Sequence, residues 1–433
     1  MNNLDHKISY LIKLCNEKSF DQAHVEYKSI IEKNFKDPKL YNLGGVINVN
    51  LKNFDAAIEC FSQALKINPK YAEANNNMGA LLKTIGKVKD SINYFENALK
   101  IKPNLTNAYN NLGASYNLLG KWDLAIQNYD KCLKINPNEK DSLNNLINLL
   151  TFYDPQNKDL NFIIKTNNLL KMNYFLFDKK KQIIDSEIIN YFKKSNNVVA
   201  ENLNKTDYNF TEIFRKNTYN LNCKRHFEVF NTFNVIPEFC FSCYKVQIEP
   251  KNIVDLLKLY IVFDNLNLKK NKIRKCFIEV RPEIGGLYKG LIYCRGINDA
   301  EEIESLLIPI IKTVIDDKTP VAIKRGCSEF AISYPKFKDK SNNMQYEKSW
   351  KEKEEIIDKQ QLNQDEVVIK DTITGLTLND FLIMRNWMMY AKKIGDKNYD
   401  KFDCDIQISK YMDWQVSRQL DFRKDEYIKI SSN

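Results

Sequence analysis

The hydrophobic positions follow two different periods along the chain. Before residue 151, apolar and small residues recur in near-copies of one helical segment, which read AIECFSQALKINP, SINYFENALKIKP and AIQNYDKCLKINP. Over residues 152–220 the apolar side chains return at helical spacing and predict two further helices. From residue 243 onward, segments such as CYKVQIE alternate apolar and polar side chains and predict β-strands. The pattern therefore predicts an all-helical first part and a mixed α+β second part.

The near-copies repeat with a fixed period of 34 residues, which indicates a repeat array. A glycine early in each unit lets the neighbouring helix approach closely, and a proline ends the second helix of the unit. The positions that recur in three consecutive units are Gly45, Gly79 and Gly113; Ala57, Ser91 and Ala125; Phe61, Phe95 and Tyr129; Ala64, Ala98 and Cys132; and Pro69, Pro103 and Pro137.

This pattern of small, aromatic and proline positions resembles the tetratricopeptide repeat (TPR) family. The resemblance covers residues about 4–150 and implies an α-solenoid in which each unit is a pair of helices. A weaker copy over residues 4–37 is typical of an N-terminal cap, and the helix DSLNNLINLL is typical of a closing half-repeat. The resemblance also implies that the concave wall of the array binds a protein or an extended peptide.

Paired asparagines recur on the first helix of the units, at Asn76 and Asn77, Asn110 and Asn111, and Asn144 and Asn145. An asparagine amide both donates and accepts hydrogen bonds, so a ladder of them can hold a peptide backbone without reading its side chains. The pattern is similar to the asparagine ladder in the TPR region of O-linked N-acetylglucosamine transferases. The alternative is that asparagine fills these positions by composition alone. A lysine-rich clamp is not evident, which argues against a carboxyl-terminal tail as the ligand.

The sequence predicts four segments, a TPR array (1–151), a helical spacer (152–220), an α+β domain (221–340) and a C-terminal helical extension (341–433). We expect a hinge over residues 195–209. In the α+β domain we expect strands over 243–249, 275–281, 287–294 and from 321 up to 333, with helices over 252–265 and 299–315. Their order, β-α-β-β-α-β, is that of the ferredoxin-like fold. In the extension, Thr377 is a suitable N-cap for an amphipathic helix.

Most cysteines lie in the second part, where their spacing allows three interpretations. Cys223, His226, Cys240 and Cys243 have the C-x2-H-x13-C-x2-C spacing of a structural zinc site. Alternatively, Cys240, Cys243, Cys276 and Cys294, with Cys327 nearby, form a thiolate pocket for zinc or an iron–sulfur cluster. A hairpin centred at Gly285 would make Cys276 and Cys294 cross-strand partners. In the third interpretation these are buried thiols that pack as small apolar side chains.

Two arginines beside glycine, Arg295 and Arg325, are candidates for binding a phosphate, sulfate or carboxylate. The alternative is that they are solvated side chains at strand ends. A third arginine, Arg281, projects from the far end of its strand and is not expected to join them.

Composition narrows the range of functions. The formal net charge is +10, from 65 basic and 55 acidic residues, without a basic block interleaved with aromatics, so we do not expect a nucleic-acid partner. No apolar run reaches the roughly 18 residues that a membrane helix needs, and the first residues carry no apolar targeting segment. We therefore expect a cytoplasmic protein without a membrane partner.

Two functions remain open from the sequence. The first is a protein- or peptide-binding scaffold whose C-terminal module has an unknown activity. The second is an enzyme, either transferase-like or metal-dependent, that acts on a polypeptide recruited by the array. The familiar phosphate-loop, dinucleotide, nucleophile-elbow and zinc-protease motifs are missing, which favours the first.

Overall fold

The chain divides into two compact units in a computed structural model. The structure describes residues 3–33, 36–203, 208–215, 221–268, 272–282, 284–338, 344–361, 365–368, 370–404, 406 and 409–431. The first unit comprises residues 1–149 together with 360–368, and the second comprises 150–359 together with 369–433. The chain therefore leaves the second unit after residue 359, contributes a short segment to the first unit, and returns.

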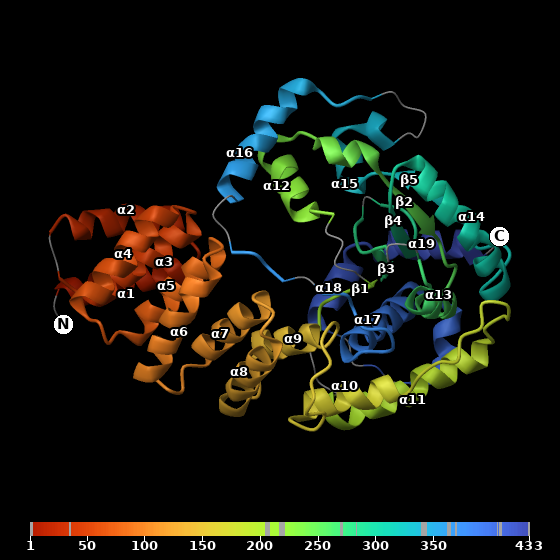
Figure 1. The fold of residues 1–433 in the computed structure, drawn as a ribbon, viewed down its shortest axis with the longest axis horizontal. Helices are drawn as coiled ribbons and strands as arrows, with labels where there is room; N and C mark the ends of the chain where they lie inside the picture. Colours follow the sequence, from red (N-terminus) through yellow and green to blue (C-terminus); the bar gives the residue numbers. More distant parts are fainter. Residues whose placement is uncertain are drawn as a thin grey trace. The chain divides into compact units, whose positions relative to one another are not determined.

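The first unit is a series of helical hairpins (Figure 1). A cap hairpin is followed by three repeats, each with a first and a second helix, and by a single closing helix. The helices are α1 (Asn3–Asn16) and α2 (Phe20–Ile31), α3 (Pro38–Asn50) and α4 (Phe54–Ile67), α5 (Ala72–Thr84) and α6 (Val88–Ile101), α7 (Thr106–Leu118) and α8 (Trp122–Ile135), and α9 (Lys140–Leu149). The first helices also contact one another, α3 with α5, α5 with α7, and α7 with α9.

The repeated glycine sets the distance between the two helices of each repeat. A Cβ atom at Gly79 would lie 2.7 Å from the ring of Phe95, which is fully buried. At Gly45 it would lie 2.3 Å from the ring of Phe61. Non-bonded carbon atoms cannot lie so close together, so any side chain at the glycine would clash with the ring. The aromatic ring of the second helix therefore packs directly on the bare backbone of the first helix. The recurring glycine and aromatic positions are thus two halves of one contact.

Two helices open the second unit, α10 (Phe162–Met172) and α11 (Asp185–Leu203). The expected hinge from residue 195 is wrong over its described first part, because α11 continues as one helix to Leu203. Ser195 is fully buried, and its hydroxyl donates to the carbonyl oxygen of Tyr191 and accepts from Asn173. These contacts hold α11 together where the polar sequence suggested a break.

The second unit contains one five-stranded antiparallel sheet with the order β1-β3-β4-β2-β5. The strands are β1 (Glu212–Arg215), β2 (Cys243–Ile248), β3 (Arg274–Ile278), β4 (Tyr288–Arg295) and β5 (Val321–Arg325). Two helices predicted between the strands pack on the sheet: α13 (Ile253–Asn265) contacts β3 and β4, and α14 (Ile297–Val314) contacts β2, β4 and β5.

Three details of the sheet differ from the sequence prediction. The strand expected to continue to residue 333 ends at Arg325, because the short helix α15 (Ser328–Ser333) follows Gly326. The four-residue strand β1 was not predicted. Cys276 lies opposite Gly290 and not opposite Cys294, so those two cysteines are not cross-strand partners.

Further helices complete the second unit, and among them α17 contacts β1 and β3. They are α12 (Cys223–Phe233), α16 (Lys351–Gln361), α17 (Leu378–Ile394), α18 (Lys410–Ser417) and α19 (Leu420–Ser431), with 3-10 turns η1 (Glu238–Ser242), η2 (Pro335–Lys338), η3 (Lys348–Trp350) and η4 (Lys397–Phe402). Thr377 caps α17 as predicted, in a capping box with Asp380. Among the described residues, no helix combines the length and the apolarity that crossing a membrane requires.

A buried charge network fixes β1 to the helices of the second unit. The guanidinium of Arg215 donates to Asp264 (2.6 Å), to both oxygens of Asp380 (3.2 and 3.1 Å) and to the hydroxyl of Tyr260 (2.8 Å). All of these side chains are buried. Burial opposes the charged form of Arg215, yet the carboxylates of Asp380 and Asp264 raise its pKa above the ordinary value. The cation and its two anions therefore stabilise one another only as a complete set.

We expect Arg215→Met to lower the free energy of unfolding by about 3–5 kcal/mol, because it leaves Asp264 and Asp380 buried without their cation. Urea unfolding measures the change. The matched control is Arg418→Met, since Arg418 is exposed and lies over the ring of Trp414; its expected cost is below about 1 kcal/mol. Equal effects of the two substitutions would contradict this account of the network.

Candidate peptide-binding surface

The predicted asparagine pairs lie on the first helices of the array, on α5, α7 and α9. Both members of each pair are at least partly buried, and Asn76 is 9% exposed. Because these helices contact one another in sequence, the pairs follow one another along a single wall. We call the wall formed by these asparagines the amide wall.

Asparagines of neighbouring repeats are hydrogen-bonded to each other with one constant offset. Asn77 Nδ2 donates to Asn42 Oδ1 (3.0 Å), Asn111 Nδ2 donates to Asn76 Oδ1 (3.1 Å), and Asn145 Nδ2 donates to Asn110 Oδ1 (2.9 Å). In each case the donor stands 35 residues after the acceptor. The ladder is thus a chain of amide pairs that join consecutive repeats, and Asn42 belongs to it although its own repeat lacks the second asparagine.

The amide pairs keep hydrogen-bonding capacity beyond the bonds between repeats. A primary amide has two N–H donors and an oxygen with two lone pairs. Each bond between repeats uses one N–H of the donor asparagine and one lone pair of the acceptor asparagine. Asn77, Asn111 and Asn145 are half-buried, so each residue keeps some accessible surface.

Lys83 adds a cation to this wall. Its Nζ donates to Asn111 Oδ1 at 2.9 Å, and burial lowers the pKa of Lys83 below the ordinary value. The sequence prediction missed this lysine. A signal was present, because Asn76, Ala80 and Lys83 follow one another at the four- and three-residue steps that share a helix face.

The candidate zinc ligands lie around one end of the sheet. Cys223 begins α12, Cys240 lies in η1, and Cys243 begins β2. The imidazole of His226 stacks on the ring of Phe239, with centroids 5.0 Å apart. Within the part of the chain that the structure describes, no three side chains of the ligand-forming types come together as a metal site. The zinc site stays a prediction, which metal analysis of the purified chain beside its Cys240→Ser and Cys243→Ser variants tests.

Cys240, Cys276 and Cys294 are buried, whereas Cys223, Cys243 and Cys327 are half-buried. The buried thiols agree with the third interpretation of the cysteines. Cys240 belongs to an apolar cluster with Phe330 and Phe337. Burial raises the pKa of Cys243 to about 12 and that of Cys327 to about 11, so both are thiols at neutral pH. Cys276 and Cys294 are buried in β3 and β4, opposite Gly290 and Tyr244.

The two candidate anion-binding arginines lie on aromatic rings. Arg295 is opposite Cys243 in the sheet and Arg325 is opposite Tyr244. The side chains of Cys243 and Tyr244 point to opposite faces of the sheet, because they are consecutive residues of β2. Their cross-strand partners Arg295 and Arg325 therefore also point to opposite faces. Arg295 lies over Phe239 at 5.2 Å, and Arg325 lies over Phe337 at 5.1 Å. The structure does not bring them together at one site.

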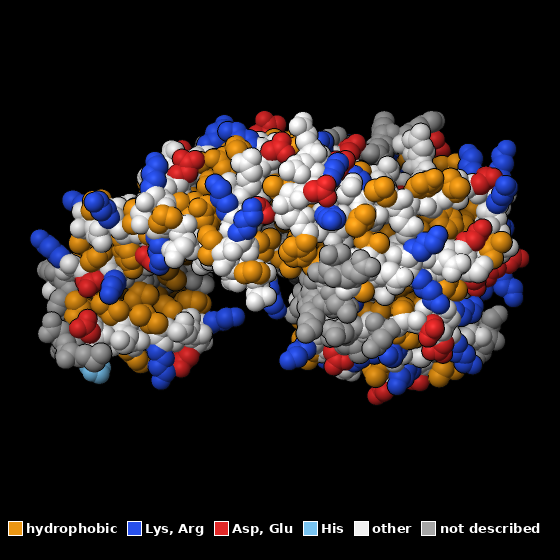
Figure 2. All heavy atoms as spheres, turned by 90° about the horizontal axis from the view of Figure 1, so that it is seen from below, with side chains coloured by type: hydrophobic (Ala, Val, Ile, Leu, Met, Phe, Trp, Pro, Cys, Tyr) orange, Lys and Arg blue, Asp and Glu red, His pale blue; other side chains and the backbone are white. Residues whose placement is uncertain are grey.

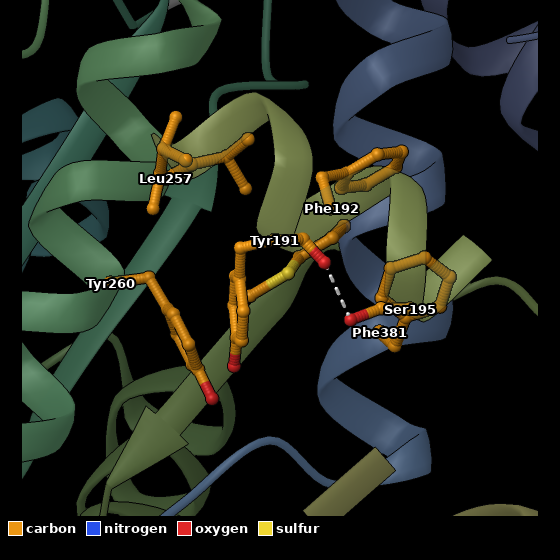
Figure 3. Close-up of a pocket in the computed structure, with 8 residues that line it drawn as sticks. Tyr191, Phe192, Ser195, Leu257, Tyr260 and Phe381 are labelled. Carbon is orange, nitrogen blue, oxygen red and sulfur yellow. Dashed lines mark hydrogen bonds between the residues drawn. The ribbon is translucent and has the colours of Figure 1, made fainter. Parts of the chain in front are cut away.

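Figure 3 shows a cavity inside the second unit, between α11, α13 and α17. Its volume is about 10 Å³ and its lining is apolar, with Tyr191, Leu257 and Phe381 among the side chains. A water molecule needs about that much room. None of the candidate arginines or cysteines lines the cavity, so it adds no support to the enzyme alternative, which stays a prediction.

Comparisons with known proteins identify the repeats. Models of the tetratricopeptide repeat match residues 72–105 and 106–139, and a TPR repeat model matches residues 45–86. Residues 45–139 are therefore a TPR region, as the period of 34 residues predicted. Repeats of this kind support a role as a protein-interaction scaffold. The comparison with curated proteins found no match.

Solved TPR structures resemble the chain at low identity. One is YrrB, described as a TPR protein with an unusual peptide-binding site (19% identity, 30% of this chain, 68% of that chain, TM-score 0.28). Another is MamA from Desulfovibrio magneticus RS-1 (21% identity, 34% and 82%, TM-score 0.31). A third is the first TPR of Spaghetti (RPAP3) bound to an HSP90 peptide (20% identity, 26% and 90%, TM-score 0.26).

We expect the stability of the second unit to fall as the pH decreases from about 6.5 to about 4. Burial, aided by Arg225, lowers the pKa of His226 from 6.5 to about 4. Between these values the unfolded chain binds a proton that the folded chain does not, so acid favours unfolding. Urea unfolding at pH 7 and pH 5 measures the difference.

The variant His226→Phe keeps an aromatic ring at this position and cannot be protonated. We expect it to lose part of the stability difference between pH 7 and pH 5. The control His6→Phe changes an exposed histidine and should keep the wild-type difference. If His226→Phe also kept the wild-type difference, the assignment to His226 would be wrong.

Proposed function

We propose that the TPR array binds an extended polypeptide along its amide wall and recruits that polypeptide as a scaffold or adaptor. The observation that carries the proposal is the constant offset of the three amide pairs, Asn77 to Asn42, Asn111 to Asn76 and Asn145 to Asn110. A regular row of donors and acceptors matches the regular donors and acceptors of a peptide backbone.

The spacing of the repeats also suits an extended ligand. An extended chain rises about 3.3 Å per residue, so three residues span about 10 Å. Packed helices lie about 8–10 Å apart. Successive repeats can therefore contact the ligand at every third residue, with one contact point for each repeat. Binding of this kind depends on the backbone of the ligand more than on its side chains.

The surface charge supports a protein partner. Figure 2 shows lysine and arginine side chains interspersed with aspartate and glutamate over the face that it presents, rather than gathered in one block. A nucleic-acid partner calls for a continuous basic stripe. Lys83 in the amide wall provides one cation, which favours a ligand carbonyl or carboxylate oxygen at that repeat.

We also infer that residues 243–325 form a ferredoxin-like module. The order β2, α13, β3, β4, α14, β5 along the chain and the order β3-β4-β2-β5 in the sheet support this topology. In this inference β1 is an additional edge strand beside β3.

The triple variant Asn77→Ala/Asn111→Ala/Asn145→Ala should weaken peptide binding at least tenfold, because it removes the donors of three consecutive rungs. The ligand is selected from an array of random 15-residue peptides probed with the purified full chain. Fluorescence anisotropy then measures its affinity, and circular dichroism checks that the helices remain. The control is Asn93→Ala, an exposed asparagine on the second helix α6, which should bind as the wild type does.

The same assay separates backbone recognition from side-chain recognition. A peptide with N-methylated backbone nitrogens should lose binding, whereas alanine substitutions in the peptide should change its affinity less than threefold. The proposal fails if the triple variant binds as tightly as Asn93→Ala, or if N-methylation has no effect.

A further inference from the structure

A short segment of the chain is docked on the repeats at a place separate from the amide wall. Residues 365–368 belong to the first unit, although residues 150–359 and 369–433 belong to the second. They adopt no helix or strand of their own. They lie on the turns that join the first and second helices of two consecutive repeats, α5–α6 and α7–α8. We call this place the turn edge and define it by Gly86, Lys89, Leu118 and Gly120.

Asp365 makes three contacts with the first of these turns. Its backbone N–H donates to the carbonyl oxygen of Gly86 at 2.8 Å. Its carboxylate accepts from the backbone N–H of Lys89 at 2.8 Å and lies 3.6 Å from Lys89 Nζ. Lys89 is in the first turn of α6, where the N–H groups have no partner within the helix. The carboxylate therefore satisfies a helix terminus and meets the positive end of its dipole.

Val368 makes the equivalent connection to the next repeat. Its backbone N–H donates to the carbonyl oxygen of Leu118, the last residue of α7, at 2.9 Å. Its side chain faces Gly120, whose φ is +73°; a Cβ atom there would lie 3.2 Å from three carbons of Val368. The glycine thus provides both the left-handed turn and the bare surface on which the valine packs.

The two contacts are spaced for an extended chain. Val368 stands three positions after Asp365, which corresponds to about 10 Å of extended backbone. That is close to the separation of packed helices, about 8–10 Å. Both backbone N–H groups reach carbonyl oxygens near the ends of first helices, which lack partners further along the helix.

We propose that the turn edge is a second peptide-binding surface of the array and that residues 365–368 occupy it in cis. The surface selects an extended segment with a carboxylate followed three residues later by a branched apolar side chain. None of its contacts uses the amide wall, so it does not depend on the function proposed above. A partner with the same pattern has to displace this segment, whose effective concentration in cis is of the order of millimolar.

Hydrogen exchange tests whether the segment is docked in solution. Asp365→Ala should accelerate exchange of the Lys89 backbone N–H at least tenfold, since that N–H then loses its acceptor. NMR of the full chain measures the rate. The control is Glu366→Ala, an exposed carboxylate in the same segment, which should leave the rate unchanged. Equal rates in the wild type and Asp365→Ala would overturn the docking in cis.

Peptide exchange tests the selectivity of the surface. A fluorescent peptide of residues 362–371 should bind Asp365→Ala/Val368→Asp full chain at least tenfold more tightly than the wild-type chain, whose surface is already filled. The same peptide carrying the two substitutions should bind neither chain. Equal affinity for both chains, equal binding of the substituted peptide, or no binding up to millimolar peptide would each overturn the proposal.

The triple asparagine variant separates the two surfaces. Introduced into Asp365→Ala/Val368→Asp, it should leave binding of the fluorescent 362–371 peptide unchanged. A tenfold loss would place that peptide on the amide wall and contradict a second surface.

Discussion

The contact between the repeated glycine and the repeated aromatic ring is the constraint on which the array depends. With no Cβ at Gly79 and Gly113, the rings of Phe95 and Tyr129 pack directly on the first helices. Because the same contact returns every 34 residues, the first helices of successive repeats stack with one register. Only with that register do asparagines 35 residues apart meet as amide pairs. The proposed binding surface is thus a consequence of helix packing.

The second unit is stabilised in a different way, by buried polar contacts between segments far apart in the sequence. Arg215 connects β1 to residues of α13 and α17. Arg423 of α19 is fully buried and donates to the carbonyl oxygens of Arg281 and Ile284 in the loop after β3. Such groups are costly to leave unpaired, so each holds its segment in a single arrangement. These contacts explain how segments far apart in the sequence are held in place around a small sheet.

Repetition explains why so much of the first unit could be predicted. Because the same residue types recur every 34 residues, the helices, the close approach at the glycines and the helix on which each asparagine pair lies could all be predicted. Asn42 was missed because its partner in the next repeat, Asn77, is found only when the offset between repeats is known. In the second unit the strands β2 to β5 followed from alternation, but the register did not. Cys276 is opposite Gly290, since the turn of the hairpin is centred before Gly285.

The docked segment could not be predicted, because its contacts join Asp365 to Lys89 across 276 positions and use mostly backbone groups. Backbone groups carry no residue-specific signal. The zinc set is the opposite case: it rests on residue-specific spacing alone, C-x2-H-x13-C-x2-C, and it stays a prediction. The stacking of His226 on Phe239 could not be read from that spacing. Spacing places residues near one another along the chain, whereas stacking and burial decide which atoms face each other.

The most direct test of the amide wall is to observe its side chains while a ligand binds. Side-chain amide resonances of the asparagines are recorded by NMR during titration of the full chain with an array-selected peptide. We expect the resonances of Asn77, Asn111 and Asn145 to shift in proportion to occupancy, while that of Asn93 on α6 stays unchanged. Shifts confined to the second helices of the repeats, with the amide wall unchanged at saturation, would contradict it.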